Sequence, residues 1–532
     1  MLSRFFNRRD LFKTGSLLAL LPGFQNRAEA EALRIGAEIY KSIGVRPIIN
    51  CKGTFTIISG SQSLPEVKAA MDQASRHYVH LDELMDAVGK RLSEITGAEW
   101  GMVSNGCAAA LAHSTAACIA GADPEKLQRL PDTRGLKNEV ISPAYSRNVY
   151  DHAVRGVGAH FVTVNSIEEY TRAFNERTAM VMILAGPGDE GPLGTQALAA
   201  IAKQKGVPVL VDAAAERLTI PNVHLQRGAT LVAYSGGKCL RGPQSAGLLL
   251  GDKKLIKAAW LHSAPHHAFG RPMKAGKEEI MGMLAAVEMW VKRDHKAEWK
   301  EWENWLDEIS TSVKRVSGVT TRVLQPEGLS NNAPRLQILW DGDALGITGA
   351  EAEKMLLEGT PRMILGGSGG SRRMGAKNSS LTIMPYMMMP GDAKMAAERI
   401  HAVLAQAKKQ APPARTPASV SLTGQWDVHL QFVFGEAHHK LVFEQSGDEL
   451  VGTHHGEFLS SDLRGTVEGD NVWLRSSHRY EGTRLGYEFN GKASADRIAG
   501  TVDLGEYGQA QFTATRHKYG QPGGVVRPVK NV

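Results

Sequence analysis

The stretch "YSGGKCLRGPQ", residues 234–244, sets one lysine, Lys238, behind two glycines at the end of the apolar run "ATLVAYS", residues 229–235. A run without polar alternates is typical of a strand that is covered on both faces of a parallel sheet. The glycines let the backbone turn tightly. A lysine held there is expected to be partly desolvated, which makes its amine available as a nucleophile. Taken alone, the stretch fits an exposed glycine loop better.

A second apolar run, "VPVLVDAAAE" at residues 207–216, contains an acidic residue, Asp212, where the run ends. Ligands of parallel sheets bind beyond the carboxyl ends of the strands, so Asp212 is predicted to face a site. Aspartate is also favoured as the residue that caps a following helix, and for Asp212 alone that structural role is the stronger interpretation.

An anion site is indicated by "VSNGCAAALAHSTAACIAG", residues 103–121. Here a short apolar run turns at Ser104, Asn105 and Gly106 into an alanine-rich helix that begins near Cys107. The first turn of a helix presents free N–H groups and the positive end of the helix dipole, both of which suit a phosphate group. An ordinary helix cap is the alternative.

Together the three segments favour a site for pyridoxal 5'-phosphate. This cofactor needs a lysine for its aldehyde, an acid for its protonated pyridine nitrogen and donors for its phosphate. Lys238, Asp212 and Ser235 are suited to these three tasks, and the turn at Ser104 adds a further anion site. The combination outweighs the structural interpretation that each segment would favour alone.

Six segments resemble one known family: "RPIINCKGTFT" (46–56), "GAEWGMVSNGCAAALA" (97–112), "SRNVYDHAVRGVGAHFV" (146–162), "VDAAAE" (211–216), "SGGKCLRGPQSAGLLLG" (235–251) and "KAGKEEIMGMLAAVE" (274–288). The family contains bacterial selenocysteine synthase (L-seryl-tRNA selenium transferase) and D-glucosaminate-6-phosphate ammonia-lyase, which are fold-type I pyridoxal phosphate enzymes. The resemblance covers about residues 40–405. It implies a Schiff base on Lys238 and a pyridine-nitrogen contact from Asp212. The phosphate contacts that it implies come from Ser104, Asn105, Gly106 and Ser235.

Other site residues follow less directly. Tyr145 is our candidate for stacking on the cofactor ring, with Arg147 and Tyr150 as alternatives. For the substrate, we expect arginine contacts, because the guanidinium fork suits carboxylates and phosphates. Arg147 is one candidate, and Arg372 or Arg373 in a glycine-rich loop are others. An exposed loop without function is an equally good interpretation of that glycine-rich segment.

The expected fold class is α/β: a fold-type I, aminotransferase-like domain with a mostly parallel sheet, a small α/β domain, and a C-terminal all-β meander barrel of the lipocalin-like kind. A sandwich is equally compatible with the C-terminal strands. The predicted division is a twin-arginine signal peptide at 1–30, the large domain with its lead-in at 31–275, a linking helix and the small domain at 276–408, a proline-rich linker at 409–420, the barrel at 421–518 and a tail at 519–532. Residues 275–315 are predicted to form one long helix.

The first thirty residues have the layout of a twin-arginine export signal. Arg8 and Arg9 precede a short apolar run, and "AEA" at residues 28–30 matches a small-residue cleavage site. We therefore expect a periplasmic or secreted protein that has no stable membrane anchor once the signal is removed. A basic start to a cytosolic protein is the alternative.

Charge and composition exclude several other classes. The formal net charge is +7, and residues 1–30 hold five cationic and two acidic side chains, so the remainder carries +4. That charge is spread thinly and forms no basic stripe, which gives no reason to expect a nucleic-acid partner. The cysteines are expected to be mostly free thiols: Cys51, Cys107, Cys118 and Cys239. No metal is expected at the paired histidines, because neighbours on a strand point to opposite faces: His438, His439, His454 and His455.

The expected activity is α,β-elimination, as in an ammonia-lyase, on an amino acid or amino-sugar acid. Selenium transferase-like or aminotransferase activity on the same fold is the alternative, and a non-catalytic binding protein is a further one. Activity on seryl-tRNA is not expected, because an exported protein does not meet aminoacyl-tRNA. A homodimer or larger homo-oligomer is expected, since fold-type I sites usually form between subunits.

Overall fold

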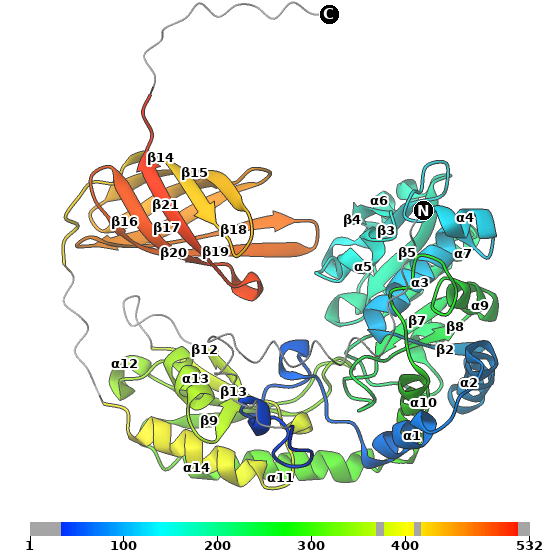
Figure 1. The fold of residues 1–532 in the computed structure, drawn as a ribbon. Coiled ribbons are helices and arrows are strands. Elements are labelled where there is room, and N and C mark those ends of the chain that lie inside the picture. The colour runs from blue at the N-terminus through cyan, green and yellow to red at the C-terminus, as the bar shows by residue number, and fades with distance from the viewer. Residues whose placement is uncertain (1–32, 369–376, 409–415, 520–532) are drawn as a thin grey trace, which may run out of the picture.

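The computed structural model describes residues 33–368, 377–408 and 416–519. The chain passes from a large α/β unit to a smaller α/β unit and then to a separate barrel (Figure 1). The large unit is built on a seven-stranded sheet in the order β2-β8-β7-β6-β5-β3-β4. Its strands are Trp100–Ser104 (β2), Glu139–Pro143 (β3), His160–Val164 (β4), Thr178–Leu184 (β5), Val209–Asp212 (β6), Leu231–Ser235 (β7) and Gly247–Gly251 (β8).

Six of these strands run in one direction, and β8 alone runs against its two neighbours. The mostly parallel sheet predicted from the apolar runs is thus confirmed. The helices of this unit are Pro65–Ser75 (α1), Leu81–Thr96 (α2), Gly106–Ala120 (α3), Pro124–Arg129 (α4), Asp151–Arg155 (α5), Ile167–Ala173 (α6), Thr195–Gln204 (α7), Val223–Gln226 (α8), Lys253–Leu261 (α9) and Lys277–Lys292 (α10). Within the described ranges, no helix has both the length and the apolar character needed to cross a bilayer.

Three strands end level with one another at one edge of the sheet. Gly247, the first residue of β8, pairs with Ser104 at the end of β2 and with Ser235 at the end of β7. On the far side of β7, Asp212 at the end of β6 pairs with Ala233. Neighbouring strands lie about 4.8 Å apart, so these three strand ends fall within about 15 Å of one another.

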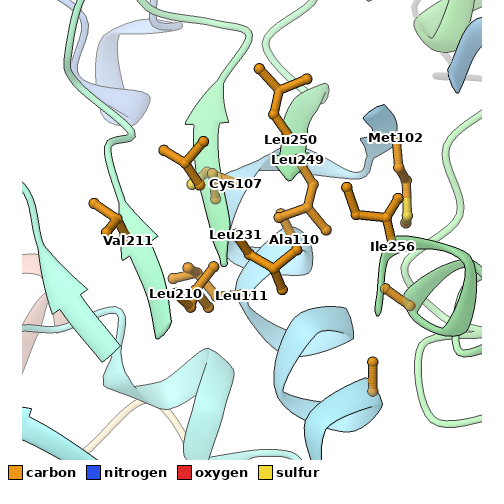
Figure 2. Packing of buried hydrophobic residues seen from close by; sticks show 14 of the residues in the cluster. Met102, Cys107, Ala110, Leu111, Leu210, Val211, Leu231, Leu249, Leu250 and Ile256 are labelled. Atoms are coloured by element: carbon orange, nitrogen blue, oxygen red, sulfur yellow. The ribbon is translucent and has the colours of Figure 1, made fainter. Parts of the chain in front are cut away.

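The core of the large unit lies between this sheet and helix α3. Figure 2 shows Ala110 and Leu111 of α3 against Leu210, Leu231 and Leu249 of the central strands, and all five side chains are buried. The helix is rich in alanine, so its axis can lie close to the sheet. This packing fixes the N-terminus of α3 at the same edge where β2, β6 and β7 end.

The smaller unit has a four-stranded antiparallel sheet in the order β12-β13-β10-β9. Its strands are Thr320–Leu324 (β9), Arg335–Trp340 (β10), Gly366–Ser368 (β12) and Ser379–Ile383 (β13), and its helices are His295–Val313 (α11), Gly342–Leu345 (α12), Gly349–Glu358 (α13) and Asp392–Ala405 (α14). Strand β1 (Ile48–Asn50) pairs in parallel with β11 (Arg362–Ile364). The lead-in before the large unit is therefore tied to the small one.

The single long helix predicted for residues 275–315 is two helices. Helix α10 ends where Arg293 adopts an extended conformation, with ψ at 140°. Asp294 then begins α11, because its carboxylate accepts hydrogen bonds from the backbone N–H groups of Lys296 and Ala297. An aspartate with this capping ability interrupts a helical pattern without disturbing the apolar spacing.

The C-terminal strands close into an eight-stranded antiparallel barrel in chain order, which confirms the barrel and excludes the sandwich. The strands are Gly424–Gln431 (β14), Glu436–Ser446 (β15), Glu449–His455 (β16), Ser460–Glu468 (β17), Asn471–Tyr480 (β18), Thr483–Ala493 (β19), Arg497–Asp503 (β20) and Gln509–Arg516 (β21). Its interior is filled by large side chains, among them Trp426, Phe443 and Phe489. The barrel therefore has a packed core.

Candidate cofactor site

The turn that carries Lys238 is held by its own backbone. The N–H of Gly236 donates to the Ala246 carbonyl at 2.8 Å, and the N–H of Arg241 donates to the Lys238 carbonyl at 2.9 Å. A Cβ at Gly236 would lie 2.7 Å from Met283 Sδ, and one at Gly237 would lie 2.7 Å from the backbone of Gln244. Neither glycine has a positive φ. The chain turns directly after β7, as predicted, and the close packing of this turn is what requires glycine at both positions.

A loop from the N-terminal lead-in covers this turn. The N–H of Ser61 donates to the Gly237 carbonyl at 3.0 Å, and the Ser61 hydroxyl is buried without a hydrogen-bond partner. Gly60 has a φ of 65°, and a Cβ on it would lie 2.7 Å from the same carbonyl. Ser61 carries no signal in the sequence, because nearly 180 residues separate it from the lysine. Its hydroxyl is a free polar group beside the candidate site.

Asp212 lies at the carboxyl end of β6, and its side chain is buried. Its Oδ1 accepts a hydrogen bond from the Ala214 N–H at 3.1 Å and a weaker one from Cys107 Sγ at 3.6 Å. Burial raises the pKa of Asp212, and the Ala214 N–H and the Lys238 charge partly oppose that rise. No hydrogen bond to Oδ2 is found among the described residues. That oxygen can accept from a protonated ring nitrogen.

The turn before α3 leaves the start of that helix open. Asn105 precedes the helix but does not cap it with its side chain, which instead donates to the Lys274 carbonyl at 2.9 Å. Gly106 has a φ of 75°, and the space where its Cβ would be is empty. The first-turn N–H groups therefore lack a side-chain acceptor and suit a phosphate.

The two serines predicted as phosphate contacts differ in whether their hydroxyl groups are free to bind a ligand. Ser104 is buried, and its hydroxyl donates to the Gly106 carbonyl at 2.9 Å. It therefore shapes the turn before α3, and its proton is not directed at a phosphate. Ser235 is half-buried at the end of β7, and no side-chain hydrogen bond is found for it in the described part of the chain. Its hydroxyl is the one available to a ligand.

The predicted stacking residue, Tyr145, lies in the short helix η4 (Ala144–Ser146) and supports a loop. Its hydroxyl donates to the Leu193 carbonyl at 2.9 Å. Its ring packs so closely on Gly188 that a Cβ there would lie 2.4 Å from the ring. The side chain is thus engaged with the loop that follows β5.

Tyr150, the alternative, immediately precedes α5, which packs on α3. Burial raises the pKa of Tyr150, and the charge of Asp212 raises it further. Part of the Tyr150 side chain is exposed and open to a ligand. This placement favours Tyr150 over Tyr145 as the aromatic residue beside a bound cofactor ring.

The placement of Arg147 does not agree with the predicted substrate contact. Only 8% of its side chain is exposed, and its Nε donates to Asp151 Oδ2 at 2.7 Å. The remaining nitrogens bond Thr163 and Glu481. A guanidinium held between two carboxylates is not free to bind a substrate anion. The other predicted arginines, Arg372 and Arg373, lie outside the described residues.

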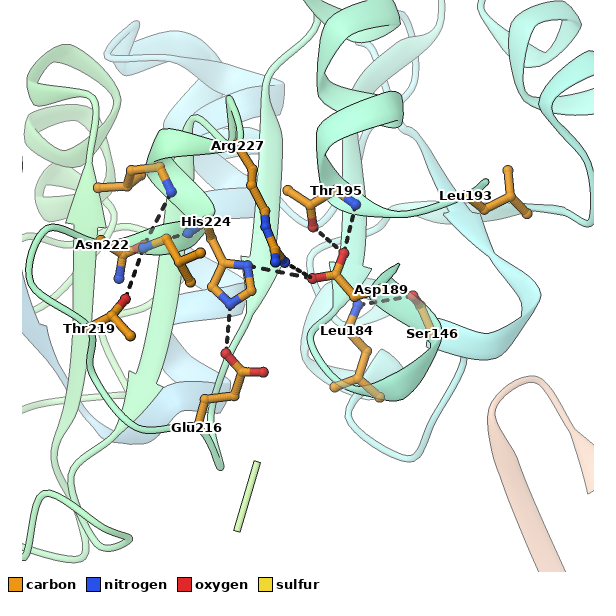
Figure 3. Close-up of polar contacts among 12 residues, drawn as sticks. Ser146, Leu184, Asp189, Leu193, Thr195, Glu216, Thr219, Asn222, His224 and Arg227 are labelled. Carbon is orange, nitrogen blue, oxygen red and sulfur yellow. Dashed lines mark hydrogen bonds and ion pairs between the residues drawn. The ribbon is translucent and has the colours of Figure 1, made fainter. Parts of the chain in front are cut away.

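A buried polar network supports the loops on either side of Asp212 (Figure 3). His224 Nε2 lies 2.6 Å from Glu216 Oε2, and its Nδ1 lies 3.6 Å from Asp189 Oδ2. Asp189 also accepts from the Thr195 N–H at 2.6 Å and pairs with Arg227 at 3.4 Å. Asp189 lies in η5 (Pro187–Glu190), after β5, while Glu216 follows β6. The network thus joins two loops at the cofactor edge.

Cys239, the thiol next to Lys238, is engaged with the loop that follows β6. Its Sγ donates to the Glu216 carbonyl at 3.0 Å, and its own carbonyl accepts from Arg293 at 3.1 Å. Burial raises the pKa of Cys239 to about 11, so the thiol stays protonated and inert at neutral pH. All four cysteines of the chain are free, as expected.

The barrel histidines alternate as the strand geometry requires: His438 is exposed and His439 is buried. The pairing of β14 with β15 brings one ligand atom each of His429, Glu436 and His438 to within 4.8 Å of one another on the outer surface. His429 and Glu436 could not be linked to His438 from the sequence, since only this strand pairing places them beside it.

The residues at the sheet edge fit pyridoxal phosphate. A buried acid with an available oxygen, a lysine on a packed turn and the open start of a long helix are all present at one edge. The unpartnered Ser61 hydroxyl and the available Ser235 hydroxyl add donors next to them. Fold and site together define a fold-type I, pyridoxal phosphate-dependent enzyme.

Comparison with known proteins gives the family, although no protein-family model matches the chain. A 5'-C-glycyluridine monooxygenase-decarboxylase from Streptomyces sp is 30% identical over 349 residues, which cover 61% of this chain and 83% of the relative. The D-glucosaminate-6-phosphate ammonia lyase of Salmonella typhimurium is 29% identical over 333 residues, which cover 60% of this chain and 87% of that protein. The chain belongs to the fold-type I pyridoxal phosphate family of these proteins and the L-seryl-tRNA(Sec) selenium transferases.

The fold comparison agrees with this assignment. A solved structure of D-glucosaminate-6-phosphate ammonia-lyase superposes with a TM-score of 0.61 at 25% identity. The match covers 98% of that chain but only 69% of this one. Nearly a third of this chain therefore has no counterpart there.

Proposed function

We propose that this protein is a pyridoxal phosphate-dependent lyase that eliminates a β-leaving group from an amino acid or amino-sugar acid, after which the α-amine is released by hydrolysis as ammonia and the carbon skeleton as a keto acid. The observation that carries the proposal is the meeting of Lys238, Asp212 and the open N-terminus of α3 at one sheet edge. The relation to an ammonia lyase supports elimination over other reactions of the same cofactor.

Each of these residues has a defined task in such a reaction. The Asp212 carboxylate would hold the proton on the pyridine nitrogen, and the first-turn N–H groups of α3, with the Ser235 hydroxyl, would bind the phosphate. The Lys238 amine would hold the cofactor and, once displaced by the amine of the substrate, take the proton from the substrate Cα. Bound pyridoxal phosphate supplies an electron sink for the charge that develops at that carbon.

Two alternatives share this machinery. Aminotransferase or racemase activity begins with the same proton transfer at Lys238, and selenium transferase-like chemistry is represented among the relatives. A tRNA substrate is disfavoured by the proposed export and by the thinly spread positive charge. The non-catalytic alternative is set aside, because the relatives are enzymes.

A screen of amino acids and amino-sugar acids tests the reaction. The purified protein, loaded with pyridoxal phosphate, should release ammonia and a keto acid in equal amounts from at least one of these substrates. Ammonia and keto acid are measured separately in the same reaction. A keto product that forms without ammonia, and only when a keto-acid acceptor is added, would show transamination and overturn the elimination.

We also propose that the protein is a homo-oligomer. Four large apolar side chains near the lead-in and before α2 are about half or more exposed: Phe55, Ile57, Tyr78 and Val79. Large exposed apolar side chains are the material from which subunit interfaces are built. Sedimentation velocity should therefore give a mass of at least two chains, and a monomer at micromolar concentration would contradict this.

Export to the periplasm or beyond is likewise proposed, on the basis of Arg8 and Arg9. The wild-type protein should be exported, whereas the Arg8→Lys, Arg9→Lys double variant should stay in the cytoplasm. Cell fractionation compares the two proteins. Equal export of both proteins would overturn the twin-arginine assignment.

A further inference from the structure

The barrel contacts the large unit through the tip of one hairpin, between β18 and β19, which Figure 1 shows next to α5. Glu481 at this tip forms an ion pair with Arg147, whose other carboxylate partner is Asp151. Both Arg147 and Asp151 are almost completely buried, with 8% and 3% of their side chains exposed. Glu481 itself is 35% exposed, so the barrel's carboxylate reaches from a partly solvated position to a buried guanidinium.

Two neighbours of Glu481 extend this contact. The guanidinium of Arg155 lies 4.9 Å from the centre of the Tyr480 ring, and its Nη2 donates to the Tyr480 hydroxyl at 3.3 Å. On the other side, a Cβ at Gly482 would lie only 2.2 Å from the Asn148 carbonyl oxygen. Only glycine permits such a close approach of the two backbones. The hairpin tip thus packs closely on the segment from Asn148 to Arg155.

The segment held by the tip runs from Arg147 through α5 and borders the cofactor site. It contains Tyr150, the residue before α5. Helix α5 packs on α3, whose N-terminus is the candidate phosphate site. Burial raises the pKa of Tyr150, and the charge of Asp212 and that of Glu506 in the barrel segment η8 (Gly505–Tyr507) raise it further. The barrel therefore meets the large unit beside the site and not at a remote surface.

We propose that Tyr480, Glu481 and Gly482 are positioning residues of the cofactor site: the barrel clamps the segment 147–155 and thereby fixes α5 against α3, whose N-terminus is the candidate phosphate site. The proposal rests on the cofactor site assigned above. It gives the C-terminal barrel a role within its own chain.

A pair of glycine variants tests the clamp in the full-length protein loaded with pyridoxal phosphate. Gly482→Ala places a methyl group against the Asn148 carbonyl, whereas the matched control, Gly486→Ala on β19 of the same hairpin, meets no atom within 4 Å. Neither glycine has a positive φ, so the two variants differ in contact and not in backbone strain. Glu481→Ala is a second test, because it removes the ion pair and adds no bulk.

Three measurements report on the clamp. In Gly482→Ala and in Glu481→Ala, amide hydrogen exchange across residues 147–155 should become about tenfold faster, as expected for the loss of one charge-assisted contact. The visible circular dichroism of bound pyridoxal phosphate should change, and the cofactor should dissociate several-fold faster. Gly486→Ala should match the wild type. Unchanged exchange in the barrel strands shows that each variant is folded.

The outcomes separate this proposal from the proposed function. A wild-type protein that fails to bind pyridoxal phosphate overturns the proposed function and the positioning role with it. If the wild type binds the cofactor and the two tip variants exchange like Gly486→Ala, the clamp does not exist. If exchange accelerates while the dichroism and the release rate stay unchanged, the contact is structural only, and the positioning role is overturned.

Discussion

Replacing Lys238 with alanine should leave a folded protein without covalently held pyridoxal phosphate and with activity reduced by about 10³-fold or more. The reason is that one amine performs two tasks, holding the cofactor and moving the substrate Cα proton. The turn around Lys238 is formed by backbone hydrogen bonds and close glycine packing, so it does not depend on the lysine side chain. Visible absorbance of the purified protein measures the loss of bound cofactor, and thermal unfolding shows that the fold is kept.

Lys274→Ala is the matched control for this variant. Lys274 belongs to the same region, since its carbonyl accepts a hydrogen bond from Asn105, but its side chain is exposed. This variant should keep the visible absorbance and the activity. Borohydride reduction of the wild-type protein, followed by peptide mapping, should place the cofactor on Lys238. A label confined to another lysine would contradict the assignment.

Replacing Asp212 with asparagine should lower the turnover by about 10²-fold to 10³-fold, because a neutral amide cannot stabilise a protonated pyridine nitrogen as a carboxylate does. The volume and the hydrogen bond from the Ala214 N–H can both be retained. The cofactor should still bind through Lys238, but more weakly. Cys107→Ala, which removes only the thiol contact to Asp212, is the control and should have a much smaller effect.

Although Asp212→Asn should lower the turnover, it should raise the stability of the cofactor-free protein. Burial raises the pKa of Asp212, so keeping its carboxylate charged destabilises the empty fold at pH values above that pKa. Without cofactor, Asp212→Asn should therefore unfold at a higher temperature than the wild type at pH 8. The difference in unfolding temperature between the variant and the wild type should shrink as the pH falls through the raised pKa of folded Asp212 towards the pKa of an aspartate in the unfolded chain. A gap that grows at low pH would show that Asp212 is stabilised as the anion.

The central part of the site could be predicted because it follows from local patterns. Apolar runs identified β6 and β7, and a parallel sheet brings the ends of such strands to one edge. Lys238, Asp212 and the start of α3 therefore meet without any detailed knowledge of packing. The prediction fails where a side chain has a choice of partner: the Ser104 hydroxyl bonds the Gly106 carbonyl, and the Tyr145 hydroxyl bonds the Leu193 carbonyl.

Contacts between loops that are distant in the sequence could not be predicted. Ser61 meets the lysine turn, and Gly482 meets Asn148, through close approaches that leave no periodic signal. The break between α10 and α11 was missed for a different reason, since Asp294 interrupts the helix while the apolar spacing continues. The closure of the C-terminal strands into a barrel depends on the pairing of β14 with β21, which strand patterns alone do not distinguish from a sandwich.

The reversed direction of β8 restricts where the chain can accept insertions without disturbing the cofactor site. Because Gly247 pairs with both Ser104 and Ser235, the short connection from Lys238 to Gly247 stays at the cofactor edge throughout. An insertion there would displace the reactive amine and the phosphate donors together. Changes in substrate selectivity are therefore expected in segments that only border this edge. A domain that contacts such a segment, as the barrel does, can alter selectivity without changing the residues that carry out the reaction.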